Sequence, residues 1–159
     1  MVENRPGWLD DPFVAVSHLG RVGLIWLLLA ALAALMWRRP AIFAWVLAGD
    51  VVADGASHGI RHLVGRDRPP VNNRDPAPLV SVPDDPALPS GHAATSFACA
   101  ALLTWLTPLA AAPLFVVAAL VAFSRVYVGV HYPLDAVAGA ALGLVVATAL
   151  RLLAAARRR

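Results

Sequence analysis

The stretch LPSGHAATSFACAALLTW, Leu88–Trp105, decides where a helix begins and where the chemistry of this chain lies. Its Pro, Ser, Gly and His stand directly before a run that is apolar enough to enter a lipid bilayer. Ser90 is a good N-cap residue, and Gly91 permits close backbone approach. The free N–H groups of the first turn would attract an anion, with His92 at the rim of that anion site. A plain helix cap beside an interfacial histidine is the alternative interpretation.

The composition of the whole chain indicates a membrane protein. Of its 159 residues, 59% are hydrophobic and 14% are charged, whereas a soluble domain has about 45–50% apolar and about 25% charged residues. The net charge of +3 comes from arginine alone. Most arginines flank or interrupt apolar segments, which argues against a solvated face that binds nucleic acid. The single cysteine, Cys99, allows no internal disulfide and is expected to be buried and inert.

Five apolar segments predict an all-α fold, a polytopic membrane helix bundle. They cover residues 22–37, 41–62, 92–106, 113–124 and 133–154. Several are shorter than the ~20 residues of a typical span, so we expect tilt or local thinning of the bilayer. Residues 1–20 are expected to form an N-terminal interfacial segment with a short helix. The whole chain, residues 1–159, is interpreted as a single domain.

A proline-rich loop, residues 65–89, separates the second and third apolar segments. It holds seven of the 13 prolines and four aspartates. That density of proline argues against helix and central strand, and loops of this length are often functional lids. We therefore expect this loop to form part of the active site.

The distribution of arginine predicts an orientation in the membrane. Arg38 and Arg39 lie between the first two apolar segments, and Arg157–Arg159 follow the fifth. Five crossings place both clusters on one face, which the positive-inside rule makes cytoplasmic. The opposite, extracytoplasmic face then carries further arginines, at positions 61, 66, 68, 74 and 125. Either the topology is inverted or these arginines have a chemical task.

Three segments bring arginines and histidines to the predicted extracytoplasmic face. They are RHLVGRDRP at 61–69, PSGH at 89–92 and SRVYVGVHYPLD at 124–135. Arginine binds phosphate oxygens through its planar fork, although interfacial snorkelling is the alternative. Asp135 can accept from one nitrogen of His131 and leave the other free to attack, or it can merely stabilise the helix dipole. Two histidines, three arginines and a helix N-terminus together favour an oxyanion-binding active site.

These motifs resemble the signature of a known family. Arg61-x6-Arg68-Pro69, Pro89-Ser90-Gly91-His92 and Ser124-Arg125-x5-His131-x3-Asp135 are similar to the three-part signature of the type 2 phosphatidic acid phosphatase superfamily. Its membrane members are lipid phosphate phosphatases, and vanadium haloperoxidases are soluble relatives. The second and third motifs match at every defining position. The first has Arg61 where the family usually has lysine, a residue of different reach and geometry.

The resemblance implies a mechanism. His131 would attack phosphorus to form a phosphohistidine, and Asp135 would orient its ring. His92 would protonate the leaving oxygen and then help water to hydrolyse the intermediate. The phosphoryl oxygens would be held by Arg61, Arg68, Ser90, Gly91 and Arg125. The family needs no metal or other cofactor, and no carboxylate and histidine cluster with metal-ligand spacing lies near these motifs in the sequence.

Two further patterns lie on the apolar segments. Asp50, Asp54 and His58 recur at four-residue steps and are expected to share one face that points into the bundle. Asp54 and His58 would position Arg61 or relay protons, with a hydrogen-bonded structural stripe as the alternative. Gly139 and Gly143 give the last segment a small-residue face, which could serve a homodimer as easily as the bundle.

We therefore expect a multi-pass phosphatase of the cell (plasma or inner) membrane, whose partners are a lipid phosphate and the bilayer. By family analogy, polyprenyl diphosphate or phosphate is the first candidate substrate, and phosphatidylglycerophosphate or phosphatidic acid is the next. A lipid phosphotransferase would use the same residues with an alcohol in place of water. A non-catalytic transporter or lipid-binding protein would be expected to lack His92, His131 or Asp135, and none is lacking.

Overall fold

The computed structural model of the chain describes residues 5–20, 23–72 and 76–156, and the secondary structure of this part is entirely helical. In chain order the elements are η1 (Gly7–Leu9), α1 (Asp10–Leu19), α2 (Leu24–Met36), α3 (Ala41–Val64), α4 (Pro69–Asn72), α5 (Gly91–Leu106), α6 (Ala111–Tyr127) and α7 (Pro133–Ala156). The all-α prediction is confirmed, and the five apolar segments correspond to α2, α3, α5, α6 and α7. Arg74 and Arg157–Arg159, which were used to predict the orientation in the membrane, lie outside the described residues.

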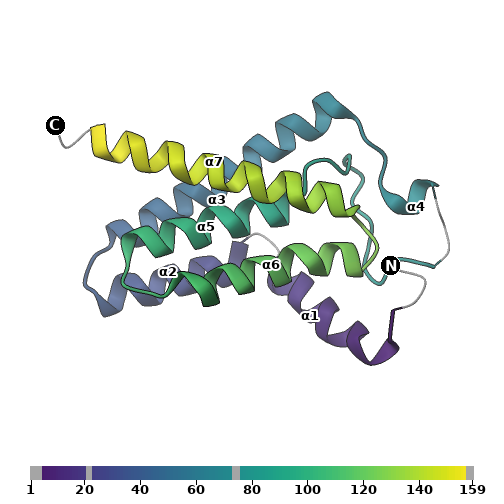
Figure 1. Ribbon diagram of the computed structural model, residues 1–159, viewed down its shortest axis with the longest axis horizontal. Coiled ribbons are helices and arrows are strands. Elements are labelled where there is room, and N and C mark those ends of the chain that lie inside the picture. The colour runs from purple at the N-terminus through teal and green to yellow at the C-terminus, as the bar shows by residue number, and fades with distance from the viewer. Residues whose placement is uncertain (1–4, 21–22, 73–75, 157–159) are drawn as a thin grey trace.

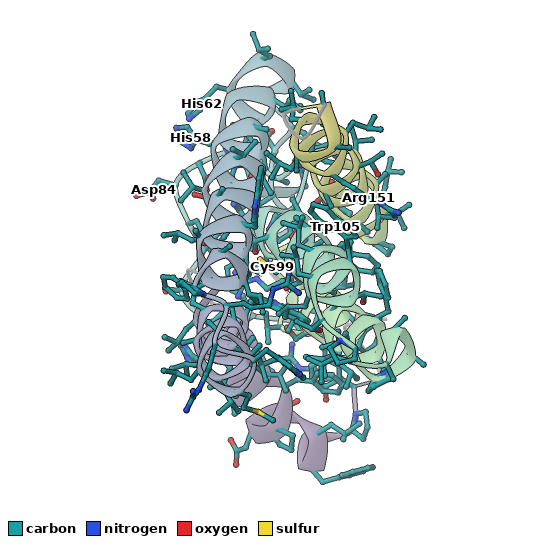
Figure 2. The ribbon with its side chains drawn as sticks, turned by 90° about the vertical axis from the view of Figure 1, so that its left-hand side faces the viewer. His58, His62, Asp84, Cys99, Trp105 and Arg151 are labelled. Carbon is teal, nitrogen blue, oxygen red and sulfur yellow. The ribbon has the colours of Figure 1, made fainter. Side chains whose placement is uncertain are left out.

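Helix α5 occupies the centre of the bundle. It contacts α2, α3, α6 and α7, and Figure 1 shows it running among them. Small side chains let its neighbours approach closely, and six of them are fully buried: Ala93, Ala94, Ser96, Ala98, Cys99 and Ala100. Trp26 of α2 donates a buried hydrogen bond of 3.0 Å to Ser96. The expected burial of Cys99 is thereby confirmed, and Figure 2 shows this side chain inside the bundle.

Helices α5 and α7 pack with their backbones in close contact at two glycines. A Cβ added at Gly139 would lie 2.3 Å from the carbonyl oxygen of Ser90, and one at Gly143 would lie 2.2 Å from that of Ala94. The small-residue face predicted on the last segment is therefore used within the bundle. This contact also holds the beginning of α7 against the beginning of α5.

Replacing Gly143 with alanine is expected to lower the free energy of unfolding by about 1–3 kcal/mol. The added methyl group would collide with the α5 backbone at Ala94, which cannot move aside as a flexible side chain can. Gly55→Ala is the matched control, because a Cβ there meets nothing within 4 Å and alanine favours helix over glycine. Thermal unfolding of both variants in detergent tests this contact, and equal melting temperatures would contradict it.

The three motif segments gather at one end of the bundle. Figure 1 places the end of α3, the beginning of α5, the end of α6 and the beginning of α7 at this end, together with α1 and the 65–89 loop. The turn between α2 and α3, which carries Arg38 and Arg39, lies at the opposite end with the connection from α5 to α6. Arg38 and Arg39, which the predicted topology places on the cytoplasmic face, are therefore at the opposite end of the bundle from the three motif segments.

The proline-rich loop contains a short helix that the sequence interpretation excluded. Helix α4 begins at Pro69 and Pro70, and a helix tolerates proline in its first turn because those N–H groups lack a helical partner anyway. The rest of the loop is tied to the bundle by backbone hydrogen bonds. Ala87 donates to the carbonyl of Arg66 at 2.8 Å, and Leu79 donates to that of Val128 at 3.0 Å.

The expectation that Asp50, Asp54 and His58 all point into the bundle is wrong. Asp50 is buried, but Asp54 and His58 are exposed, and Figure 2 shows His58 and His62 on the outer side of α3. A four-residue step exceeds one helical turn by about 40°, so the side chains drift around the helix. The ring of His58 contacts that of His62 instead, at a centroid distance of 4.5 Å.

The helices differ in their capacity to cross a bilayer. By length and composition, α7 alone among the described helices could span a membrane, and a second span results if α1 and α2 are counted as one bent segment. Helices α2, α5 and α6 have 13, 16 and 17 residues, fewer than the ~20 of a typical span. The count of five spans therefore stays a prediction.

Candidate active site

Arg68 lies at the centre of a hydrogen-bond network at the end of the bundle where the three motif segments gather. Its Nη1 donates to the carbonyl of Val130 at 3.0 Å and lies 3.1 Å from Nε2 of His131. Its Nε donates to the carbonyl oxygen of Asp85 at 2.7 Å. Its Nη2 donates to Oδ1 of the same residue, also at 2.7 Å. Burial lowers the pKa of Arg68, which Asp85 partly offsets, but a guanidinium remains charged in proteins. One side chain thus joins the first motif, the loop and the third motif.

His131 has its two ring nitrogens in different environments. Since a guanidinium only donates, Nε2 facing Arg68 must accept, and the ring proton belongs on Nδ1. This Nδ1 lies 3.5 Å from Oδ2 of Asp135, a separation at the outer limit of a hydrogen bond. Burial lowers the pKa of His131, and the Asp135 carboxylate opposes that shift without cancelling it. The ring is therefore neutral at neutral pH and keeps a lone pair on Nε2.

Asp135 is held from two sides so that it faces His131. Arg66 Nη1 donates to its Oδ1 at 2.9 Å, and the backbone N–H of Tyr132 donates to its Oδ2 at 2.8 Å. The carboxylate is fully buried, which is tolerable because both oxygens have donors. The backbone N–H of His131 donates to the carbonyl of Arg125 at 3.2 Å, which fixes the turn between α6 and α7.

The beginning of α5 is joined to the beginning of α7 by the backbone of Ser90, whose N–H donates to the carbonyl of Asp135 at 2.9 Å. Ser90 is the N-cap residue, but its hydroxyl makes no cap hydrogen bond. This Oγ is fully buried and has no partner among the described residues, so it is available to a ligand. Gly91 allows Arg61 to approach the beginning of α5 closely, because a Cβ there would lie 2.8 Å from Nη1 of Arg61.

His92 lines two cavities. One of about 200 Å³ is lined by Ser17, His18, Val80, Ser81, Pro83, His92 and Arg125. The other, of about 210 Å³, is lined by Gly20, Gly23, Asp50, Asp54, Gly91, His92 and Thr95. The first cavity brings His92 and Arg125 to a common space. Asp54 lines the second one, so it lies near the site, whereas His58 points away.

The structure therefore unites most of the residues that the motifs nominated. Arg61, Arg68, His131 and Asp135 are linked by direct contacts through Asp85 and Arg68. Ser90 and Gly91 join them through α7 and Arg61. His92 shares one cavity with Arg125 and the other with Gly91. Among residues 5–20, 23–72 and 76–156, no group of three or more His, Cys, Asp or Glu side chains is arranged to hold a metal. That the protein uses no cofactor stays an expectation.

Three contributors to the site were not expected from the sequence. Asp85 bridges the two arginines, with its Oδ2 2.8 Å from Nε of Arg61. Arg66, which was not among the arginines nominated to bind phosphate, is the partner of Asp135. Ser17 of α1, in a segment without a diagnostic motif, accepts a hydrogen bond from Nη1 of Arg125. The only sequence signal for Asp85 was the density of aspartate in the loop.

Arg61→Lys is expected to keep phosphate release within about threefold of the unaltered protein, because lysine preserves the charge that faces Asp85 and the α5 N-terminus. Arg61→Ala removes that charge and is expected to lower activity about a hundredfold or more. Both rates should be measured on protein whose melting temperature is checked. An inactive but folded Arg61→Lys protein would mean that the site requires a guanidinium.

Comparison with known sequences identifies related proteins. A sequence model of the PAP2 superfamily matches residues 27–159. A decaprenylphosphoryl-5-phosphoribose phosphatase of Mycobacterium tuberculosis H37Rv is 39% identical over 147 residues, which cover 90% of this chain and 78% of the relative. An undecaprenyl-diphosphatase of Sulfolobus acidocaldarius is 34% identical over 146 residues, or 88% of this chain and 68% of the relative.

Two solved structures share the arrangement of helices. A transmembrane PAP2-type phosphatidylglycerolphosphate phosphatase from Bacillus subtilis superposes with a TM-score of 0.76 at 25% identity, covering 96% of this chain and 79% of that chain. Aquifex aeolicus LpxE superposes with a TM-score of 0.77 at 25% identity, covering 94% and 88%. The bundle is therefore similar to those of membrane PAP2 phosphatases.

Proposed function

This chain belongs to the PAP2 superfamily, and from that premise we propose that it is an integral membrane phosphatase that hydrolyses a polyprenyl phosphate or diphosphate. One observation carries the proposal. Nε2 of His131 lies 3.1 Å from a buried guanidinium nitrogen of Arg68 while Nδ1 of the same ring faces Asp135. A neutral imidazole with an oriented lone pair beside a phosphate-binding group is suited to attack on phosphorus.

The proposed reaction has two steps. In the first, the lone pair of His131 Nε2 forms a bond to phosphorus while the bond from phosphorus to the leaving oxygen breaks, and His92 gives its proton to that oxygen. In the second, His92 accepts a proton from water as the water oxygen attacks phosphorus. The bond from phosphorus to nitrogen then breaks, and orthophosphate leaves. Asp135 stabilises the His131 ring as positive charge develops on it.

The phosphoryl oxygens would be held by Arg61, Arg68, Arg125, the Ser90 hydroxyl and the Gly91 N–H. These donors would stabilise the charge that grows on the oxygens in the transition state. The unpartnered hydroxyl of Ser90 supports this role, since a buried hydroxyl is costly without an acceptor or donor. Arg68 must move from His131 Nε2 onto the phosphoryl group before attack. No step in this scheme requires a metal.

A position within the membrane is supported by the perimeter of the bundle. Large apolar side chains are exposed on α2, α3 and α7, including Leu28, Leu35, Leu63, Val145 and Leu152. Soluble monomers rarely expose contiguous apolar surface of this kind, which lipid would cover. We propose a single phosphatase domain that spans the cell membrane several times. The separation of Arg38 and Arg39 from the site supports an extracytoplasmic site and a cytoplasmic C-terminus.

Phosphate release in detergent tests the proposed function. The panel should compare polyprenyl diphosphate, polyprenyl phosphate, a polyprenylphosphoryl-5-phosphoribose, phosphatidylglycerophosphate and phosphatidic acid, each with and without chelator. We expect the fastest release from a prenyl substrate and no effect of the chelator. An added acceptor alcohol that becomes phosphorylated would identify a phosphotransferase instead. Absence of release from every lipid would contradict the proposal.

A further inference from the structure

The Asp85 carboxylate lies between the two arginines of the first motif. Its Oδ2 is 2.8 Å from Nε of Arg61, and its Oδ1 is 2.7 Å from Nη2 of Arg68. The Arg68 side chain is 4% exposed, that of Arg61 10% and that of Asp85 24%. Two negatively charged oxygens that bridge guanidinium groups are the arrangement a phosphoryl group makes with the same partners.

We propose that Asp85 is an internal competitor of phosphate. Its carboxylate occupies the position between Arg61 and Arg68, and it has to leave this position before a phosphoryl group can bind there. It thereby sets the affinity of the site for phosphate and favours release of the product. The inference rests on the proposed phosphate-binding role of these two arginines. It adds a residue that lies in none of the three motifs.

The charges of the site favour such an exchange. Two buried guanidinium groups without an anion would repel each other and leave their charge uncompensated. Asp85 compensates them, and a phosphoryl group could do so equally. Burial raises the pKa of Asp85, but Arg61 and Arg68 lower it more, so that the net shift is below the ordinary value of a carboxyl group. Asp85 is therefore an anion at neutral pH.

The contact between Asp85 and Arg68 also affects the proposed nucleophile, His131. The guanidinium that Asp85 holds through Nη2 also lies against Nε2 of His131 through Nη1, at 3.1 Å. While Asp85 holds Arg68 in this position, the lone pair of His131 is engaged. Entry of a phosphoryl group in place of Asp85 would draw Arg68 onto its oxygens and release that lone pair. Exchange of one anion for another would thus couple substrate binding to exposure of the nucleophile.

Binding of orthophosphate to the whole purified protein in detergent tests this inference without turnover. Asp85→Asn keeps the shape of the side chain and removes its charge, and we expect it to bind orthophosphate about tenfold more tightly than the unaltered protein. Orthophosphate should also raise the melting temperature of Asp85→Asn by more than it raises that of the unaltered protein. The matched control is Asp84→Asn, which makes the same charge change one residue away. Asp84 is exposed and points away from the bundle in Figure 2, so its variant should bind like the unaltered protein.

Opposite results would overturn the inference in identifiable ways. Weaker binding by Asp85→Asn would mean that the carboxylate orients the arginines for phosphate instead of competing with it. Equal affinity of the Asp85 and Asp84 variants for orthophosphate would mean that Asp85 does not occupy the position where phosphate binds. An Asp85→Asn protein that fails to fold even in saturating orthophosphate would also contradict it, because phosphate should replace the carboxylate. Tighter binding without release from any lipid would leave this inference standing and refute only the proposed function.

Discussion

His131→Ala is expected to abolish phosphate release, with a loss of about 10⁴-fold or more. The substitution removes the lone pair that would form the bond to phosphorus, and no neighbouring group can take that position. Arg68 and Arg61 cannot act as nucleophiles because a guanidinium has no free lone pair. Asp135 is fully buried and already accepts from Arg66 and Tyr132. Turnover on the lipid panel measures the loss.

Trapping the intermediate gives a second readout for this variant. With substrate labelled in the transferred phosphoryl group, the unaltered protein should carry acid-labile label after rapid quenching, and His131→Ala should carry none. His62→Ala is the matched control, since His62 lies on the outer side of α3 in Figure 2 and is exposed. It should be as active as the unaltered protein. Unchanged turnover by His131→Ala on every lipid phosphate would refute the mechanism.

His92→Ala is expected to slow turnover by about 10²–10⁴-fold, the usual contribution of a general acid and base. The alkoxide of a lipid monophosphate leaves poorly without a proton, and the second step also loses the base that activates water. The size of the loss should therefore depend on the leaving group. With a lipid aryl phosphate, whose leaving group needs no proton, the first step should recover while the second stays slow.

A burst experiment separates these two steps. His92→Ala should release about one equivalent of the aryl alcohol per active site in a fast phase and then turn over slowly, as expected when an intermediate accumulates. The unaltered protein should show a much faster steady state. An equal loss on both substrates, with no burst, would show that His92 is not the acid. His62→Ala again controls for removal of an imidazole.

Local sequence signals located the helices well. Ser90 and Gly91 predicted the beginning of α5, which begins at Gly91, and Pro133 predicted the beginning of α7, which begins at Pro133. Such boundaries depend on backbone conformation within one turn, so neighbouring residues suffice to predict them. The motif residues were also nominated correctly as neighbours, because each stands at the end of an apolar segment on the same predicted face.

The sequence by itself determined an all-helical chain with an apolar perimeter and three motifs that meet at one end. Only the tertiary structure decided which groups complete the site. Asp85 lies between two arginines, Arg66 pairs with Asp135 across 69 positions and Ser17 accepts from Arg125 across 108. It also decided that His58 faces outward. Contacts between distant positions depend on how whole helices and the loop pack against one another, and no periodicity or local preference along the chain encodes that packing.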